Sequence, residues 1–269
     1  PRIWSLMPFL NSPPPSPPRR IVSLCPSVTD TIYAFGAWDR LVGRTRYCVH
    51  PRGLVQAIEH VDGTKTPDLQ RLFSLKPDLV VAVKEENREE DVAAIVAAGV
   101  PLLLLDPNSV EEAAEAAREL GDALDCPIEG ELLARTLKRD LAAVRARAAG
   151  RIAPRIAYLV WWEPAMLAGA GTYIASLLDA VGLHNTAPPG RYPELSVGDL
   201  AELGLDAVLL PTEPFPFKER HREEVAAALE VPLDRVVIVD GELLSWHGAR
   251  TVRGLRYASE LVDRLRAEL

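Results

Sequence analysis

The chain has 269 residues, a formal net charge of −8 and a sequence pI near 5.3. This acidic balance excludes a broad nucleic-acid-binding face, which requires clustered Lys and Arg, although it is compatible with a local basic pocket. Hydrophobic residues make up 48% of the chain and charged residues 25%, as in ordinary globular proteins, and the length suits two domains. No apolar run of about 18 residues occurs, so we expect no membrane span.

The N-terminal segment, residues 1–18, is predicted to be an extended Pro-rich lead-in. Its second half reads NSPPPSPP, which favours a polyproline-like conformation. The first ten residues are largely apolar with one early charge, Arg2, but they are too short and too interrupted to form a signal peptide as they stand. A leader removed from the chain is still compatible with this pattern.

After the lead-in, apolar strands alternate with helices, which divides the chain into an N-terminal lobe (19–126), a connecting helix (127–150) and a C-terminal lobe (151–269). The strands are nearly continuous runs of Val, Leu and Ile, typical of parallel strands buried on both faces. Glycines such as Gly36 and Gly99 follow the predicted helix ends. Strands are predicted over 20–24, 78–83, 101–105, 155–160, 206–210 and 235–239, and helices over 26–35, 69–75, 89–98, 110–124, 172–181, 197–203, 217–229 and 252–267.

The connecting segment from Pro127 to about Ala149 has a charged amphipathic pattern, and proline suits the first turn of a helix. No proline or glycine interrupts residues 132–149, and Gly130 lies in the first turn. Because the sequence lacks a residue that would kink this helix, we expect the helix to be stiff. The two lobes should therefore keep nearly the same relative angle with and without ligand.

The second lobe repeats the pattern of the first. Asp78 and Asp206 stand 128 residues apart, and each precedes an apolar strand. The repeated positions are Leu69, Leu72, Leu75 and Asp78 in the first lobe and Val197, Leu200, Leu203 and Asp206 in the second. The predicted fold class is α/β, with two Rossmann-like βα lobes that have parallel central sheets and are joined by one long interdomain helix.

Ligands of open parallel sheets bind beyond the carboxyl ends of the strands, so a cleft between two such lobes is the predicted site. Aromatic residues are scarce in the chain, yet they gather in these loops, where their faces suit a large flat or partly apolar ligand. We expect Trp161, Trp162 and Trp246 to face the cleft. The aromatic candidates are Tyr47, Trp161, Trp162, Phe215, Phe217 and Trp246, and the polar candidates are Arg44, Arg46, His50, Glu163, Glu213, Lys218, His221, Glu242 and His247.

Motifs for catalysis, redox chemistry and metal binding are missing from the sequence. The GAG of Gly169–Gly171 lacks the third glycine of a dinucleotide fingerprint, and neither a phosphate-binding loop nor a GxSxG motif occurs. Cys25, Cys48 and Cys126 are too few for a disulfide framework, although one Cys25–Cys48 bridge is left open. Side chains that a metal ion could draw on are His50, His247, Glu213 and Glu242. Since no ligand spacing defines such a site, we expect no resident cofactor and no catalytic residue.

Four segments resemble the helical-backbone substrate-binding proteins of ABC importers, a group that includes cobalamin-, haem- and siderophore-binding proteins. They are RRIVSLCPSVTDTIYAFGAWDRLVG (Arg19–Gly43), RYCVHP (Arg46–Pro51), the LxRLxxLKPDLVVAV segment ending at Val83, and the helix from Pro127. The resemblance covers nearly the whole chain from Arg19 onward. It implies two α/β lobes around a stiff helix.

The resemblance also implies roles for single residues. Tyr47 lies where cobalamin-binding members carry a ligand-stacking tyrosine, and Tyr192 with Pro193 lies near their Trp-Pro pair. Trp161 falls near a cleft phenylalanine, and Glu242 falls near a cleft aspartate. These positions place ligand contacts in both lobes.

Docking on a permease is expected to differ from that of the cobalamin-type receptors. Their two docking glutamates align with Gln70 and Gly198, neither of which carries a charge. Asp68 and Asp199 are neighbours that could substitute for them.

The sequence therefore favours a solute-binding protein that holds a metal chelate or tetrapyrrole-like ligand, of the cobalamin, haem or iron–siderophore class, for ABC-type import. The alternatives are a soluble intracellular carrier or sensor on the same fold, an enzyme that uses the cleft, and a receptor for a bare metal ion. The expected partners are a small-molecule ligand and an ABC permease, with no nucleic acid. The resemblance implies a periplasmic or cell-surface location, whereas the lack of a visible signal peptide keeps the cytoplasm open.

Overall fold

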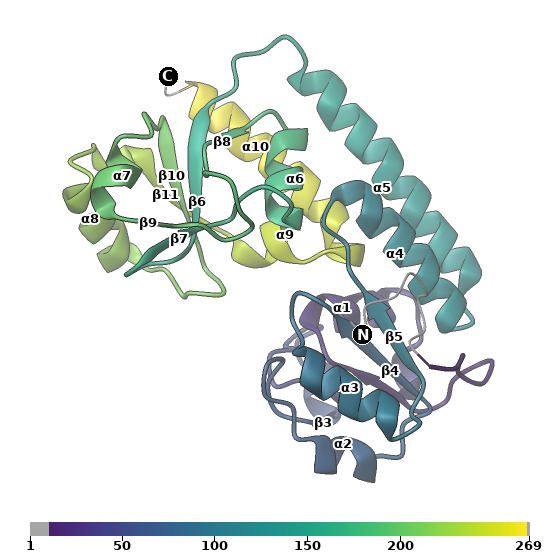
Figure 1. Cartoon of the computed structure of the whole chain (residues 1–269). Helices are drawn as coiled ribbons and strands as arrows, with labels where there is room; N and C mark the ends of the chain where they lie inside the picture. The colour runs from purple at the N-terminus through teal and green to yellow at the C-terminus, as the bar shows by residue number, and fades with distance from the viewer. Residues whose placement is uncertain (1–10, 268–269) are drawn as a thin grey trace. The chain divides into compact units, whose positions relative to one another are not determined.

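The computed structural model describes residues 11–267, and the contacts within it divide the chain into two compact units (Figure 1). The N-terminal unit comprises residues 11–107, 111–136 and 247–250, and the C-terminal unit comprises residues 108–110, 137–246 and 251–267. The first part of the lead-in, residues 1–10, lies outside the described residues, and residues 11–18 form neither helix nor strand. In the described part of the chain, no helix has both the length and the apolar character that a membrane crossing requires.

The N-terminal unit is built on a five-stranded, wholly parallel sheet of order β3-β2-β1-β4-β5. The strands are β1 (Ile21–Ser23), β2 (Leu41–Arg44), β3 (Glu59–His60), β4 (Leu79–Val83) and β5 (Leu102–Leu105). Both faces of the sheet are covered, as the apolar runs predicted. Leu79 and Val81 of β4 pack in one core with residues of α1 (Pro26–Ala34) and α4 (Val110–Ala123). Val80 packs in a second core with residues of α2 (Leu69–Ser74) and α3 (Glu89–Ala97).

The C-terminal unit contains a six-stranded sheet of order β11-β10-β6-β7-β9, with β8 paired to β6. The strands are β6 (Arg155–Trp161), β7 (Ala165–Leu167), β8 (His184–Asn185), β9 (Glu194–Leu195), β10 (Ala207–Pro211) and β11 (Val236–Val239). Strands β6, β8, β10 and β11 are parallel, which confirms the predicted central sheet. The antiparallel edge of β7 and β9 was not predicted, because these strands are too short to show a pattern in the sequence.

The same set of hydrogen bonds holds the start of a buried strand in each unit. In the N-terminal unit, the carboxylate of Asp78 accepts hydrogen bonds of 2.8 Å from the backbone N–H groups of Arg19 and Arg20. The Arg20 guanidinium in turn donates to the carbonyl oxygen of Leu75 at 2.6 Å, at the end of α2. Charge-assisted bonds of this kind are among the stronger ones in proteins, and here they align the starts of β1 and β4.

The C-terminal unit has the same hydrogen bonds at the predicted position. The carboxylate of Asp206 accepts from the backbone N–H of Arg155 at 2.7 Å, and the Arg155 guanidinium donates to the carbonyl oxygens of Leu203 and Gly204. The starts of β6 and β10 are aligned in the same way. The repeat counted in the sequence is therefore a repeat of hydrogen bonding as well as of apolar residues.

The helices end where glycines were expected to end them. Gly36, Gly99, Gly150 and Gly182 follow the last turns of α1, α3, α5 and α6 and have φ values of 74°, 77°, 73° and 84°, which a side chain would disfavour. The connecting helix α5 (Pro127–Ala148) is continuous. The remaining helices are α6 (Tyr173–Ala180), α7 (Val197–Ala201), α8 (Glu219–Ala228), α9 (Gly241–Ser245) and α10 (Thr251–Ala267), with short 3₁₀ turns η1 (Trp38–Arg40), η2 (Val55–Ala57), η3 (Leu233–Arg235) and η4 (Gly248–Arg250).

Two glycines let α4 and the first turn of α5 touch backbone to backbone. A Cβ atom on Gly130 would lie 2.8 Å from the carbonyl oxygen of Ala117 and 3.0 Å from the Cα of Gly121. A Cβ atom on Gly121 would lie 2.8 Å from the Cα of Gly130. Since real Cβ atoms do not approach backbone atoms this closely, the crossing of the two helices requires glycine on both.

We expect Gly130→Ala to lower the free energy of unfolding by roughly 1–3 kcal/mol, because the added methyl group must push two backbones apart. The effect should appear even though alanine is the better helix former, a preference worth about 1 kcal/mol. Urea unfolding measures it. Gly198→Ala is the matched control, because a Cβ there meets nothing closer than the Ser196 hydroxyl oxygen at 3.8 Å. Equal free energies of unfolding for the two variants would contradict the close backbone contact between α4 and α5.

Candidate functional site

The loops at the carboxyl ends of the strands carry most of the residues that the sequence singled out. We call those of the N-terminal unit, residues 25–27, 45–51, 61–66 and 84–87, the N-terminal loop set. We call those of the C-terminal unit, residues 161–164, 190–193, 212–217 and 240–246, the C-terminal loop set. Each is described within its own unit.

Tyr47 presents an exposed ring in the N-terminal loop set, with 49% of the residue accessible. The Arg46 guanidinium lies 5.0 Å from the centre of this ring and donates to the Tyr47 hydroxyl at 2.9 Å. The same guanidinium donates to the carboxylate of Asp62 at 2.8 Å. Arg46 is therefore held from two directions and in turn orients the tyrosine, which suits a ring that stacks on a ligand.

Asn87 joins three loops of the N-terminal set, and sequence reasoning did not single it out. Its amide nitrogen donates to the carbonyl oxygens of Leu24 and Thr64, and its amide oxygen accepts from the backbone N–H of Val83 at 2.8 Å. The residue is 4% exposed. Because the three partners follow or end β1, β3 and β4, one side chain sets the spacing of the loops that would meet a ligand.

Glu86, the neighbour of Asn87, is a further residue of this loop that is absent from the candidates drawn from the sequence. Its carboxyl group is half-buried and makes no hydrogen bond or ion pair to any described residue. Burial raises the pKa of Glu86 above its ordinary value, while the Lys65 ammonium lowers it in part. A half-buried carboxyl group without a protein partner is suited to a hydrogen-bond donor on a ligand.

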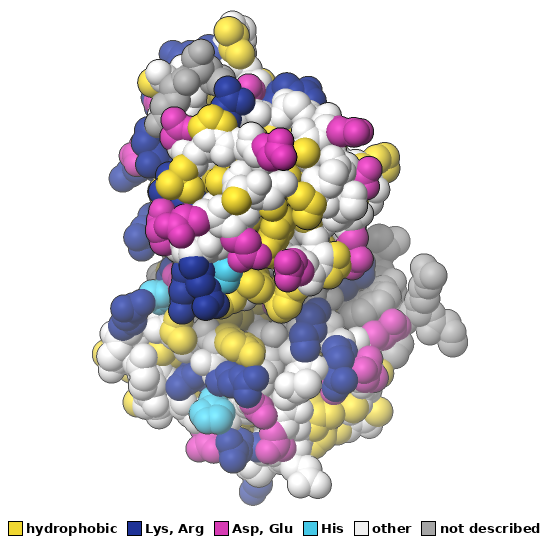
Figure 2. All heavy atoms as spheres, turned by 90° about the vertical axis from the view of Figure 1, so that its left-hand side faces the viewer, with side chains coloured by type: hydrophobic (Ala, Val, Ile, Leu, Met, Phe, Trp, Pro, Cys, Tyr) yellow, Lys and Arg dark blue, Asp and Glu magenta, His cyan; other side chains and the backbone are white. Residues whose placement is uncertain are grey.

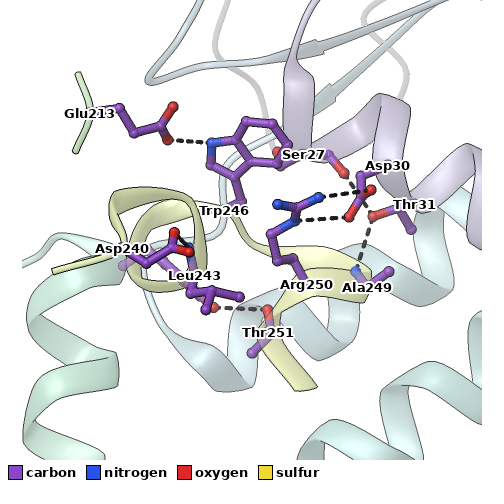
Figure 3. Close-up of polar contacts among 11 residues, drawn as sticks. Ser27, Asp30, Thr31, Glu213, Asp240, Leu243, Trp246, Ala249, Arg250 and Thr251 are labelled. Atoms are coloured by element: carbon purple, nitrogen blue, oxygen red, sulfur yellow. Dashed lines mark hydrogen bonds and ion pairs between the residues drawn. The ribbon is translucent and has the colours of Figure 1, made fainter. Parts of the chain in front are cut away.

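The polypeptide of residues 247–250 packs on α1, directly behind the loop that follows β1 (Figure 3). The Arg250 guanidinium forms two bonds to the carboxylate of Asp30, at 3.1 and 3.2 Å, and Arg250 is 7% exposed. The backbone N–H of Ala249 donates to the Thr31 hydroxyl at 3.1 Å. Gly248 has a φ of 85°, and a Cβ atom there would collide with the same hydroxyl. This segment thus holds the middle of α1 in place.

His247 belongs to this segment and is a structural residue rather than an exposed ligand contact. It is 8% exposed, and its Nε2 atom lies 3.2 Å from the hydroxyl oxygen of Ser27. Burial lowers the pKa of His247 to about 4, so the ring is neutral near pH 7. Arg44 is likewise internal, since it is 8% exposed and donates to the carbonyl oxygens of Val55 and Thr45.

The C-terminal loop set contains a connected group of rings. Trp161 is 44% exposed and meets Phe215 edge to face, with 4.9 Å between ring centres. Phe215 contacts Phe217 at 4.6 Å and His221 at 5.1 Å. Phe217 is only 3% exposed and packs in the core of the unit, so it supports Phe215 and is not itself a surface for a ligand. Trp161 and the half-buried Phe215 are the accessible members.

The expectation that three tryptophans face a cleft is wrong for Trp162. Its ring is 6% exposed and lies in the hydrophobic core of the C-terminal unit, and its indole N–H donates to Glu224 at 2.8 Å. Successive side chains of an extended strand point to opposite faces, and Trp162 comes directly after Trp161, the last residue of β6. Trp246 is also buried, at 7% exposure, so that Trp161 alone of the three exposes its ring.

Trp246 instead anchors an acidic side chain (Figure 3). Its indole N–H donates to the carboxylate of Glu213, which also accepts from the Ser245 hydroxyl at 3.1 Å. Asp240 caps α9 by accepting from the backbone N–H of Leu243 at 3.0 Å. Glu242 follows in the first turn of α9 and is half-buried. The carboxylates at the ends of β10 and β11 are thus oriented by indole, hydroxyl and backbone donors.

Tyr192 projects from a loop that is held by a close backbone contact. The residue is 37% exposed. Its neighbour Arg191 donates to Asn108 at 2.6 Å and to the carbonyl oxygen of Gly171. A Cβ atom on Gly169 would fall 2.1 Å from the carbonyl oxygen of Gly190, so glycine is required where the two loops meet. The GAG sequence that fails as a dinucleotide motif has this packing role.

Residues 11–267 contain no cluster of three or more His, Cys, Asp or Glu side chains that could hold a metal ion. The three thiols are free, so the bridge that the sequence left open is not formed. Cys25 and Cys48 are buried, which raises the pKa of both, whereas Cys126 is half-buried.

A family model described as periplasmic binding protein matches residues 21–217, which include the sheet of the N-terminal unit and the C-terminal unit as far as the loop after β10. The chain belongs to the periplasmic binding protein family. The vitamin B12-binding protein of Salmonella paratyphi A is 30% identical over 174 residues, and that of Vibrio parahaemolyticus is 26% identical over 187 residues. These alignments cover 65% and 67% of this chain. The chain spans a little under two thirds of the length of these relatives, 64% and 66%.

Solved structures of similar fold extend the match to nearly the whole chain. A periplasmic heme-binding protein from Pseudomonas aeruginosa has a TM-score of 0.80 at 24% identity, covering 91% of this chain and 92% of its own. The periplasmic vitamin B12-binding protein of Vibrio cholerae has a TM-score of 0.78 at 20% identity, covering 93% and 98%. At these identities the likeness establishes the fold.

We expect the stability of this periplasmic binding protein to depend on pH through His247. In the unfolded chain the ring binds a proton below about pH 6.5, but in the folded chain it does so only below about pH 4. Between these values the unfolded state holds more protons, so the free energy of unfolding falls as the pH falls, by up to about 3 kcal/mol from this group. Urea unfolding at pH 7 and pH 4.5 measures the loss. His247→Gln should reduce it, whereas His184→Gln, at an exposed histidine, should leave it unchanged.

We also expect Asn87→Ala to lower the free energy of unfolding by roughly 2–4 kcal/mol, since it leaves three buried backbone groups without partners. Gln56→Ala serves as the control, because the Gln56 side chain accepts a single exposed bond from the backbone N–H of Gly53. Thermal unfolding of both variants decides the point. A loss no larger than that of the control would show that water replaces the amide.

Proposed function

We propose that the chain is a solute-binding protein that holds a metal chelate or tetrapyrrole-like ligand, of the cobalamin, haem or iron–siderophore class, for import by an ABC-type transporter. The observation that carries the proposal is the exposure of oriented aromatic rings at the carboxyl ends of the strands in both units, Tyr47 in one and Trp161 in the other. Exposed rings held by neighbours rather than packed in a core are suited to a large, flat ligand.

The comparisons support the same ligand class. The two relatives reported above are named for vitamin B12, and structures of the same fold are named for heme and vitamin B12. The proposal includes no resident cofactor and no catalytic step. It includes a location outside the cytoplasmic membrane, which the family membership supports.

The proposed permease partner would meet a surface that differs from the one implied by the resemblance. Gln70 on α2 and Gly198 on α7 are exposed and uncharged. The nearby carboxylates are exposed but already engaged: Asp68 caps α2 by accepting from the backbone N–H of Arg71, and Asp199, in the first turn of α7, accepts from the hydroxyl of the N-cap Ser196. A permease that binds this protein would therefore find shorter acidic side chains close to the helix starts.

A visible spectrum and a native mass spectrum of the freshly purified chain test the ligand class directly, since each proposed ligand is coloured and has a distinctive mass. Titration with the ligand found should then quench tryptophan fluorescence. We expect Trp161→Ala to weaken binding about tenfold, as the loss of one aromatic stacking contact would. Trp38→Ala is the control, because Trp38 is 52% exposed in η1, which directly precedes β2, whereas the N-terminal loop set follows the strands. Unchanged affinity of the Trp161 variant would refute the stacking role.

A further inference from the structure

A cavity of about 200 Å³ lies in the C-terminal unit. It is bounded by α7, by the start of β10 and by the end of α8, so it lies at the amino ends of the strands, far along the sheet from the C-terminal loop set. The lining residues that matter here are Leu200, Leu205, Val208, Leu229, Val231 and Arg235. Figure 2 views the side that carries α7 and α8 and shows hydrophobic side chains gathered there among acidic ones.

The lining is aliphatic apart from one side chain. Leu200 and Val208 are 0% and 2% exposed and belong to the hydrophobic core of the unit, so the cavity reaches into that core. A bound water needs two to four polar partners, which such a lining does not offer, whereas an apolar cavity of about 150 Å³ is known to accept a molecule of the size of benzene. The space therefore suits a compact hydrocarbon group.

The exception is Arg235, at the end of η3. Its side chain is exposed, and its guanidinium makes no hydrogen bond or ion pair to any described residue. The neighbouring Arg222 is different, because its guanidinium donates to the carbonyl oxygens of Val236 and Leu233 and pairs with Glu219. A guanidinium that the fold leaves unused, beside an apolar cavity, matches a carboxylate carried on a hydrocarbon body.

We propose that this cavity binds a small monocarboxylic acid with a compact aromatic or branched aliphatic body, with its carboxylate on Arg235. The site is separate from the loop sets and does not depend on the proposed function. It would let the protein respond to a second, simpler molecule while its main ligand is bound elsewhere.

The test uses the full chain and three probes of graded chemistry, followed by the methyl resonances of the Leu and Val residues in the cavity. Benzoate has both the body and the charge, benzyl alcohol has the body alone, and acetate has the charge alone. We expect benzoate to shift the resonances of Leu200, Val208 and Leu229 and to bind about tenfold more tightly than either other probe. If benzoate moves none of these resonances at tens of millimolar, the proposal is overturned.

Variants test the contact with the carboxylate and the contact with the apolar body separately. Arg235→Gln should weaken benzoate binding about tenfold and leave benzyl alcohol unchanged, because it removes one charge-assisted contact. Arg256→Gln, at an exposed position on α10, is the matched control and should change neither. Ala201, at the end of α7, also lines the cavity, so Ala201→Leu should fill it and abolish binding of both aromatic probes while the melting temperature is maintained. Equal benzoate affinity in the Arg235 and Arg256 variants would overturn the assignment of the carboxylate.

Discussion

In each unit, an aspartate just before one buried strand binds the backbone of the neighbouring strand through its carboxylate, and this contact organises the sheet. Asp78 and Asp206 each accept backbone N–H groups at the start of the adjacent strand, and the arginine of that strand ties the preceding helix to the same point. Because the strands begin level and are only three to seven residues long, they also end close together. Trp161, at the end of β6, and the loops after β1 and β4 take their positions from this alignment.

Much of this arrangement could be predicted because its causes are local or periodic. Continuous apolar runs indicated buried parallel strands, and glycines such as Gly36 and Gly99 marked the helix ends by their need for positive φ. The repeat of the pattern around Asp78 at Asp206 indicated a second parallel sheet. Tyr47 and Trp161 could be predicted to be exposed, since each lies just after a predicted strand.

The rest depends on contacts between residues far apart in the chain, which no local pattern records. Trp162 directly follows Trp161 in the sequence, but its ring lies in the core of the C-terminal unit, where its indole N–H donates to Glu224. Asn87 looks like an ordinary loop residue until its three backbone partners come together. His247 resembles a ligand contact in the sequence, yet its surroundings are those of a core residue.

The unequal burial of the three thiols has a practical consequence for labelling. Maleimide reagents attack the thiolate of an accessible cysteine, and burial raises the pKa of both Cys25 and Cys48 and shields them. Cys126, at the junction of α4 and α5, is the accessible one. Among residues 11–267, Cys126 is thus the one attachment point for a fluorophore or spin probe, just before the start of α5, without any engineered cysteine.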